Sequence, residues 1–569
     1  MWLIRRKSIE RILNEAACET DSHSHTGLRK VLGVRDLTFL GIAAIIGAGI
    51  FSTIGSAAFN GGPGIVFLFV ITAITCGFSA LCYAEFASRV PIAGSAYTYA
   101  YVSFGEVVAW IIGWALILEY AIGNIVVAIS WSGYFNNLLE ALHINLPAWL
   151  TTNGFTAQEQ YDDVLKAMQG GAQLQDLPKP LIKGWEAYTM APVMGGWRFI
   201  INLPAFLIVV FITAIAYIGI KESKKSTNAM VVFKVAVIIF IIILGFFYVD
   251  TNNWDPFLPN GFGGVLAGVS AVFYAYIGFD AISTTAEECK NPRRDLPRGM
   301  IYSLVICTVL YILIALVLTG MVPFTELKVD DPLAYVFERL GMGRVSYLIS
   351  VSAVIATTSV LLVFQLGQPR IWMSMSRDGL LPKKFSNVHR KYHTPAFATI
   401  ITGILVGIPA LFIPSGIVTD LTSIGTLFAF VLVCFGVLLL PRLKKQPGKF
   451  QLPYINGQII IPLSVLLFIF IFRTRISEAF ININDEGYQE ILLLVFLLIA
   501  AVTAVVTFIK KLSFIPIFGA LCCLYLMIEI PAISWLWFFA WMMLGLLIYF
   551  LYGRRHSLVA KYQRDEKQA

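Results

Sequence analysis

Long apolar runs follow one another along almost the whole chain, separated by short polar stretches. Many approach the roughly 20 residues that a helix needs to cross a bilayer. They lie at about 37–60, 64–87, 104–132, 198–220, 227–249, 262–287, 299–322, 344–375, 396–414, 418–440, 457–473, 489–510, 512–530 and 533–553. The pattern predicts an all-α polytopic membrane protein with about 14 transmembrane helices in total.

Composition agrees, since 58% apolar residues, 13% charged residues and a mean hydropathy of +0.76 lie outside the range of soluble domains. With an even number of spans, the basic clusters all fall on one side. They are Arg5, Arg6, Lys7, Arg29 and Lys30; Lys221, Lys224 and Lys225; Lys290, Arg293, Arg294 and Arg298; Arg377, Lys383, Lys384, Arg390 and Lys391; Arg442, Lys444 and Lys445; and Arg554, Arg555 and Lys561. Basic residues favour the cytoplasmic side. We expect a multi-pass protein of the cell inner (cytoplasmic) membrane with both termini cytoplasmic, and topology explains the net charge of +8 without a nucleic-acid partner.

The polar segments outside the predicted spans indicate less about structure and function than the spans do. Residues 1–35 mix basic and apolar positions at near-helical spacing, which indicates an amphipathic helix along the inner interface, with a disordered tail as the alternative. Residues 554–569 form the cytoplasmic C-terminal tail. The long external loop at 133–196 contains pieces that can form short helices, and its role stays open.

Two glycines interrupt the first span. The run GIAAIIGAGIF at 41–51 places Gly47 and Gly49 at mid-membrane, where glycine holds a helix poorly. Unpaired backbone at this depth persists only where it faces protein, a cavity or a ligand. Span 6 has a similar interruption at Gly278, beside Asp280. Close helix packing is the alternative explanation for each glycine, but matching interruptions are typical of transporter binding sites.

Interrupted spans that are five apart imply an inverted repeat. We expect the first repeat at 36–250, the second at 251–441 and four extra spans at 442–553. This is a 5+5 inverted repeat with discontinuous helices 1 and 6.

Four motifs in the sequence resemble those of a known protein superfamily. They are LGVRDLTFLGIAAIIGAGIF at 32–51, SALCYAEFASRVPIAGSAYTY at 79–99, YIGFD at 276–280 and MSRDGLLP at 375–382. In order and spacing they resemble the amino acid-polyamine-organocation superfamily, and within it the bacterial branch of the cationic amino acid transporter family. The similarity runs from about 28 to 445 and implies a LeuT-type fold. Ala43 stands where the family more often has glycine, and the loop at 133–196 is larger than in compact members.

The resemblance implies a site for an amino acid at the two interruptions. Amides of Gly47, Ala48 and Gly49 would bind the carboxylate, as a helix N-terminus suits an anion. Backbone carbonyls would receive the α-ammonium group. They belong to Ile45 in span 1 and to Tyr274, Ala275 and Ile277 in span 6. Phe279 resembles the aromatic gate that closes over the substrate.

Lys234 places an amino group about 10 Å inside span 5, counted at 1.5 Å per residue. Ionisable residues at such depth are rare and functional. Proton-coupled relatives resemble this chain in having a lysine there, so Lys234 is the candidate coupling residue, with Thr358 and Ser359 of span 8 as possible contacts. Snorkelling toward the interface is the alternative for Lys234, and bonding back to their own helix is the alternative for the hydroxyls.

Further polar residues lie inside the spans. Glu119 in span 3 suits a proton-linked or substrate-facing acid in the pocket, or a structural acceptor. Asp280 follows the span 6 interruption directly, which favours capping or stabilisation of the break. Thr357 is a candidate for setting the size and polarity of the substrate pocket.

Charged residues at the predicted cytoplasmic ends form a candidate inner gate. The candidates are Glu85, Arg89, Glu287, Glu288, Arg377 and Asp378. Exposed ion pairs contribute about 0–1 kcal/mol, which suits contacts that must break. Loop solvation and topology anchoring are the alternatives.

The sequence as a whole indicates a secondary active transporter that imports L-amino acids by alternating access, with proton symport and a cationic or small neutral substrate. An exchanger or uniporter of amino acids or polyamines is one alternative, and an amino acid sensor without net transport is another. Motifs of metalloproteases, phosphate-binding loops and nucleophile elbows do not occur, so no enzyme activity is expected. We expect no cofactor, protons as coupling ion, and membrane lipid as a partner; a small membrane subunit or a homo-oligomer stays open.

Overall fold

A computed structural model describes residues 5, 7, 32–47, 49–90, 95–219, 224–329, 331–392, 394–440, 450–481 and 488–561. Of the predicted interfacial segment 1–35 only residues 5, 7 and 32–35 are described, and of the predicted tail 554–569 residues 554–561. Helices make up the regular structure of the described residues apart from one hairpin of two two-residue strands and isolated bridges, with turns and loops between them.

The first part of the chain contains the first interrupted span and the longest helix, α6. Its elements are α2 (Val34–Ile45), η1 (Gly49–Thr53), α3 (Ile54–Gly61), η2 (Gly62–Gly64), α4 (Ile65–Arg89), α5 (Ser95–Ser103), α6 (Glu106–Ala141), α9 (Leu203–Ile218) and α10 (Lys224–Phe246). Helix α6 extends nine residues beyond the predicted end of span 3 at 132. Helix α5 is a separate short element that the hydropathy pattern did not predict.

An insertion between α6 and α9 folds into its own small unit. It contains η3 (Ala148–Leu150), α7 (Gly154–Gln169), η4 (Leu174–Asp176), α8 (Lys179–Met190), β1 (Val193–Met194) and β2 (Trp197–Arg198). Ala157, Ala187 and Ile200 form its core, and Tyr161 stacks on Trp185 at 4.7 Å. The predicted short helices are therefore present, whereas the antiparallel β1–β2 hairpin was not foreseen.

The second part repeats the alternation of long helices with one interruption. Its elements are η5 (Thr251–Trp254), α11 (Gly261–Ala267), α12 (Val269–Tyr274), η6 (Asp280–Glu288), α13 (Pro292–Met321), η7 (Phe324–Glu326), α14 (Pro332–Arg339), α15 (Gly343–Arg377), η8 (Lys383–Ser386), α16 (Ala396–Phe412) and α17 (Ser415–Leu439).

The C-terminal part adds α18 (Ile460–Ile471), α19 (Arg473–Ile481), α20 (Tyr488–Lys510), α21 (Phe514–Ile528), α22 (Ala532–Ile548), η10 (Tyr549–Gly553) and α23 (Arg554–His556). Helices α18, α20 and α21 share a hydrophobic cluster of their own. Helix α22 docks on α6 through reciprocal hydrogen bonds, because the Trp114 indole donates to the Trp541 carbonyl at 2.9 Å and the Trp541 indole donates to the Trp114 carbonyl at 3.1 Å.

Seven described helical segments are long and apolar enough to cross a membrane. A further pair, Ile460–Ile471 and Arg473–Phe480, is bent by 71°, and four apolar helices are shorter. The structure therefore supports a multi-pass helical membrane protein, while the count of 14 stays a prediction.

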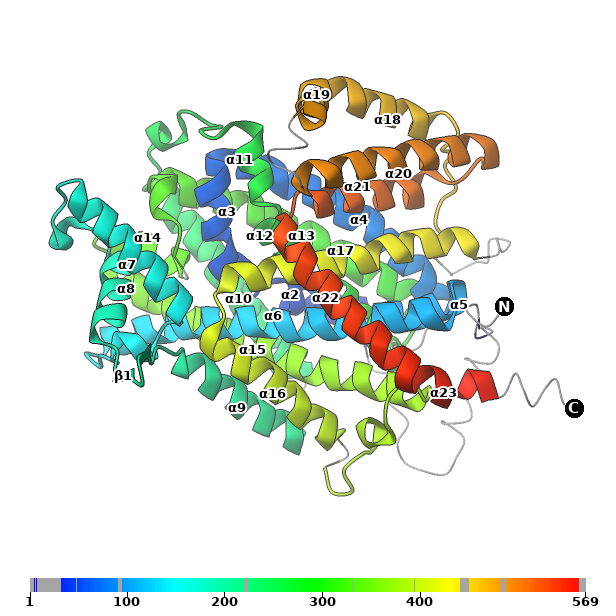
Figure 1. The fold of residues 1–569 in the computed structure, drawn as a ribbon, viewed down its shortest axis with the longest axis horizontal. Helices are drawn as coiled ribbons and strands as arrows, with labels where there is room; N and C mark the ends of the chain where they lie inside the picture. The colour runs from blue at the N-terminus through cyan, green and yellow to red at the C-terminus, as the bar shows by residue number, and fades with distance from the viewer. Residues whose placement is uncertain are drawn as a thin grey trace, which may run out of the picture.

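The long helices run between two opposite sides of the molecule. Helices α7 and α8 and strand β1 lie at the left of Figure 1, and α23, the last described helix, lies at the right. Helix α6 spans the distance between them and packs against α15, α17 and α9. We call the side of α23 the terminal face.

Candidate functional site

The first interrupted span breaks where the sequence places its glycines. Helix α2 ends at Ile45, because Ile46 adopts an extended conformation with φ −77° and ψ 93°. A π turn starts at Gly49, and the amides of Ile50 and Phe51 both donate to the Gly47 carbonyl at 3.2 Å. Ala48 lies outside the described residues. Among the described residues, the Gly47 and Gly49 amides donate no backbone hydrogen bond to another segment.

The second interrupted span breaks at the matching place. Helix α12 ends at Tyr274, residues 275–279 form turns, and a 3₁₀ helix starts at Asp280. Gly278 has a φ of +115°, a conformation that side chains disfavour. Asp280 is 2% exposed, and its carboxyl group lies next to the backbone amides of Gly278, Asp280 and Ala281. This is the break-stabilising position that the sequence favoured for Asp280.

The two breaks touch each other through glycine. A Cβ atom on Gly49 would lie 2.4 Å from Ala275 Cα, and one on Gly278 would lie 2.9 Å from the backbone carbon of Ala44. Backbone atoms cannot move aside as a flexible side chain can. The glycines therefore serve the close approach of two backbone segments, beyond their weak helix propensity.

The candidate ammonium-binding carbonyls differ in the hydrogen bonds that they already accept. The Tyr311 hydroxyl of α13 donates to the carbonyls of Ile45 and Ala275, at 2.9 and 2.8 Å. The Tyr274 carbonyl accepts from the Ile277 amide at 3.2 Å. Tyr311 is a site residue that the sequence analysis missed, although a tyrosine in the middle of an apolar span signals a hydroxyl that needs a partner.

Lys234 points its amino group at the end of α2. The side chain is 1% exposed, and Nζ lies 3.5 Å from the Ala43 carbonyl and 3.4 Å from the Ile46 carbonyl. Snorkelling to an interface is therefore not observed.

The contact of Lys234 with Thr358 and Ser359 stays a prediction, because in the described part of the chain both hydroxyls donate to their own helix. The Thr358 hydroxyl donates to the Val354 carbonyl at 2.6 Å, and the Ser359 hydroxyl donates to the Ala356 carbonyl at 2.8 Å. Short hydroxyl side chains in a helix bond the preceding turn when no better acceptor is near. Thr357 does the same with the Ala353 carbonyl at 2.6 Å, so its hydroxyl faces its own helix.

Glu119 is 3% exposed, and its Oε2 has no hydrogen-bond partner among the described residues. Its carboxyl group lies near Asp280 and near the Thr426 side chain. Phe279 is fully buried beside them, with ring centroids 5.1 Å from Phe430 and 6.2 Å from Tyr83. An unpartnered carboxylate oxygen and an aromatic cluster thus adjoin the second break.

The candidate gate residues lie in two places. Glu85 is 2% exposed and accepts from Arg89 Nε at 2.7 Å and from the Leu452 amide at 2.7 Å. Asp378 accepts hydrogen bonds from Lys7 Nζ and the Tyr97 hydroxyl, both at 2.6 Å. The Glu287 and Glu288 side chains lie outside the described residues.

A second carboxylate joins both ends of the chain at the terminal face. Glu106 is 1% exposed and accepts from the Tyr101 hydroxyl at 3.1 Å, the Tyr549 hydroxyl at 2.9 Å and the Ser557 hydroxyl. Arg5 lies 3.7 Å away as an ion pair. We call the whole set the terminal-face network, and it consists of Arg5, Lys7, Tyr97, Tyr101, Glu106, Asp378, Tyr549 and Ser557.

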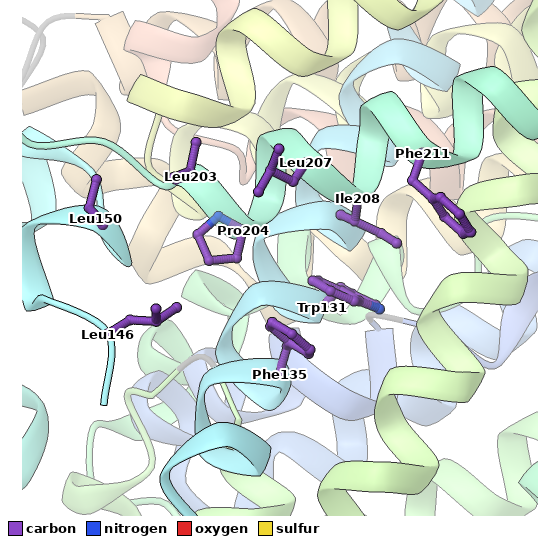
Figure 2. Close-up of a pocket in the computed structure, with 9 residues that line it drawn as sticks. All are labelled: Trp131, Phe135, Leu146, Leu150, Leu203, Pro204, Leu207, Ile208 and Phe211. Atoms are coloured by element: carbon purple, nitrogen blue, oxygen red, sulfur yellow. The ribbon is translucent and has the colours of Figure 1, made fainter. Parts of the chain in front are cut away.

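One cavity of about 420 Å³ lies apart from the breaks, between α6, η3 and α9 (Figure 2). Its lining consists of Trp131, Phe135, Leu146, Leu150, Leu203, Pro204, Leu207, Ile208 and Phe211. The Trp131 indole N–H already donates to Thr358 at 2.9 Å. The lining of this cavity is apolar, which suits a nonpolar group better than a charged ligand.

Two family models match the chain. The one described as "Amino acid permease" matches residues 32–481, and the one described as "C-terminus of AA_permease" matches residues 512–557. Both discontinuous spans lie within the first match.

Individual relatives extend over almost the whole chain. The branched-chain amino acid permease BcaP of Bacillus subtilis (strain 168) is 37% identical over 557 residues, 98% of each chain. The methylthioribose transporter of the same organism is 36% identical over 564 residues, 98% of this chain and 99% of the relative. The vacuolar cationic amino acid transporter 2 of Arabidopsis thaliana is 34% identical over 497 residues, 86% of this chain and 70% of the relative.

Proposed function

The chain belongs to the amino acid permease family of the amino acid-polyamine-organocation superfamily, and from this premise we propose that it imports L-amino acids by alternating access, coupled to protons. The observation that carries the proposal is the junction of the two breaks, where Gly49 meets Ala275 and Gly278 meets Ala44. A zwitterion needs partners of both signs in one place, and this junction offers backbone groups of both kinds.

The helix ends at the junction have opposite polarity. Helix N-termini carry partial positive charge and helix C-termini partial negative charge. The amides of Gly47 and Gly49 precede the second half of span 1, which suits the carboxylate. The C-terminal ends of α2 and α12 present the carbonyls of Ile45 and Ala275, which suits the ammonium group. Ala48, Tyr274 and Ile277 complete the proposed backbone site.

The packing of the long helices supports the proposed inverted repeat. Helix α6 packs against α15, α4 against α13, and α9 against α16. In each pair the two helices are five spans apart in the predicted order. Such pairing accompanies repeats that are related by symmetry.

Proton coupling is proposed for Lys234. Its amino group reaches two carbonyls at the end of α2, on either side of the Ile45 carbonyl that belongs to the proposed ammonium site. A charged donor makes hydrogen bonds about twice as strong as a neutral one. Protonation of Lys234 would therefore strengthen its hydrogen bonds to the end of α2 and hold this helix end at the site. Loss of the proton would weaken these hydrogen bonds and let the helix end move.

Opening to the cytoplasm is proposed at the terminal face. The basic clusters of this side favour a cytoplasmic location. Release of the substrate would require the terminal-face network to separate, together with the contact between Glu85 of α4 and the Leu452 amide.

The side chain of the substrate depends on residues beyond the backbone site. Glu119, with its unpartnered oxygen, favours a cationic substrate if it faces the bound side chain. Phe279 and Thr357 would then limit its size. The similarity to BcaP instead favours a branched-chain neutral amino acid.

A second candidate function follows from the comparison. The methylthioribose transporter is nearly as similar as BcaP over the same length. Methylthioribose is an uncharged sugar, so it has neither group that the breaks would recognise. Exchange of amino acids, uniport of amino acids and sensing without transport are further candidate functions for a site of this kind.

Uptake into liposomes that contain the purified protein tests these functions. Labelled L-leucine, L-alanine, L-arginine, L-lysine and L-glutamate are supplied outside, with and without an inward proton gradient, and protein-free liposomes serve as control. We expect at least one amino acid to accumulate, more strongly with the gradient, and excess methylthioribose or polyamine not to compete. Amino acid binding without uptake would favour a sensor, and competition by methylthioribose alone would favour sugar transport.

A further inference from the structure

A single hydroxyl group joins the two breaks. Tyr311 of α13 is fully buried, and its hydroxyl oxygen lies 2.9 Å from the Ile45 carbonyl oxygen and 2.8 Å from the Ala275 carbonyl oxygen. Ile45 is the last residue of α2, and Ala275 directly follows the last residue of α12. The last carbonyls of a helix lack partners within the helix. Tyr311 therefore supplies a donor to both helix ends at once.

In this arrangement the Ile45 and Ala275 carbonyl oxygens can still accept further hydrogen bonds. A tyrosine hydroxyl has one hydrogen, whereas each carbonyl oxygen has two lone pairs. At any moment one of the two carbonyls lacks the hydrogen bond from Tyr311. An ammonium group that approaches the pair thus finds two acceptors held side by side, without having to break every bond between Tyr311 and the carbonyls.

The position of the hydroxyl is set by its aromatic surroundings. The Tyr311 ring packs against Phe69 of α4 at 5.7 Å and against Tyr276 at 5.4 Å between centroids. Tyr276 is also fully buried, and its own hydroxyl donates to the Phe69 carbonyl at 3.0 Å. The ring can therefore keep its place when only the hydroxyl is removed.

We propose that Tyr311 is a positioning residue that holds the carbonyls of Ile45 and Ala275 as a paired acceptor for the primary ammonium group of the substrate, and so selects primary over N,N-dimethylated amines, which have only one N–H group. The role rests on the proposed amino acid transport. It requires no step of covalent chemistry. Its specific consequence is a link between the Tyr311 hydroxyl and the number of N–H groups on the ligand.

The test compares Tyr311→Phe with Tyr276→Phe in purified protein reconstituted in liposomes. Tyr276→Phe removes a buried hydroxyl from the same aromatic cluster; the residue belongs to the second break, but its hydroxyl donates to the Phe69 carbonyl of α4, outside both breaks. Competition against the best-transported amino acid of the panel is measured with that amino acid and with its N,N-dimethyl derivative, and the melting temperature reports folding.

For the parent protein we expect the N,N-dimethyl derivative to compete about tenfold more weakly, because its single N–H group can serve only one of the two carbonyls and a hydrogen bond to a charged group is lost. In Tyr311→Phe we expect affinity for the amino acid to fall about tenfold and the penalty for N,N-dimethylation to shrink to about twofold. Tyr276→Phe should keep the parent affinity and the parent penalty to within about twofold.

Three outcomes would overturn the role. The parent could bind the N,N-dimethyl derivative as well as the amino acid, which needs no variant to observe. A folded Tyr311→Phe could keep the full N,N-dimethyl penalty, or Tyr276→Phe could match Tyr311→Phe in both values. A parent protein that binds no amino acid at all would instead contradict the proposed function itself.

Discussion

The junction of the breaks and the terminal-face network are held together by different kinds of contact. At the junction, backbone meets backbone so closely that Gly49 has no room for a methyl group, and neutral hydroxyl and amide groups make most of the polar contacts. At the terminal face, the carboxylates of Glu106 and Asp378 accept hydrogen bonds from tyrosine hydroxyls and form ion pairs with basic side chains near the N-terminus.

The difference teaches how one chain can combine recognition with movement. A site that reads the part common to all amino acids needs a fixed shape, and backbone groups supply a shape that side-chain rotation cannot alter. A face that opens needs contacts that break one at a time, and single ion pairs or hydrogen bonds contribute only about 0–1.5 kcal/mol each. Changes at the junction should therefore affect transport most, and changes at the terminal face should mainly affect local opening.

The largest effect is expected from Gly49→Ala. The added Cβ would lie 2.4 Å from Ala275 Cα, so the two breaks must separate. Overpacking of this kind costs about 1–3 kcal/mol, which corresponds to a loss of about 10–100-fold in uptake rate. Gly77→Ala in α4 is the control, because its nearest neighbour would be a Leu304 methyl at 3.9 Å. Equal uptake rates for the two folded variants would contradict the close contact of the breaks.

A selective effect is expected from Lys234→Ala. Loss of the amino group near the Ala43 and Ile46 carbonyls should abolish the response to an imposed proton gradient, about tenfold in accumulation per pH unit for one coupled proton. Exchange of labelled for unlabelled substrate, which needs no net proton movement, should persist. Lys166→Ala, at a side chain that is 75% exposed, is the control. If Lys234→Ala liposomes still respond to the gradient like the parent, the lysine is not the coupling residue.

The smallest effect is expected from Glu106→Gln. The amide weakens the contacts to Tyr549, Ser557 and Arg5 but keeps the shape of the side chain. We expect a melting temperature lower by a few °C and faster hydrogen exchange in residues 549–561, with little change in substrate affinity. Glu338→Gln, which alters a 40% exposed residue that pairs with Lys179, should change neither quantity. Unchanged exchange in 549–561 would show that Glu106 does not hold the C-terminal segment.

The sequence predicted the features that depend on local chemistry. Gly47, Gly49 and Gly278 marked the breaks because glycine conflicts with a membrane helix, and Lys234 stood out because an amino group in an apolar run must find acceptors. The structure agrees with both breaks and with the burial of Lys234.

Contacts between residues that lie far apart along the chain could not be predicted from the sequence. Lys7 meets Asp378 across 371 positions, and Ser557 meets Glu106 across 451. Hydropathy carries no information about such pairs. The contact of Lys234 with Thr358 and Ser359 stays a prediction: both hydroxyls donate to carbonyls of their own helix, and their oxygens can still accept a hydrogen bond. Tyr311 was missed because its partners are backbone carbonyls, which every residue has.

The central claim is that the junction of the breaks recognises both charged ends of an amino acid. Its most direct measurement is the thermal stability of the purified protein, titrated with the best-transported amino acid, with the amine that lacks its carboxylate and with the acid that lacks its amino group. A ligand that binds the folded state raises the melting temperature by mass action. We predict a rise with the amino acid and at most a small one with either analogue at the same concentration. An equal rise with the amine or the acid would contradict the claim.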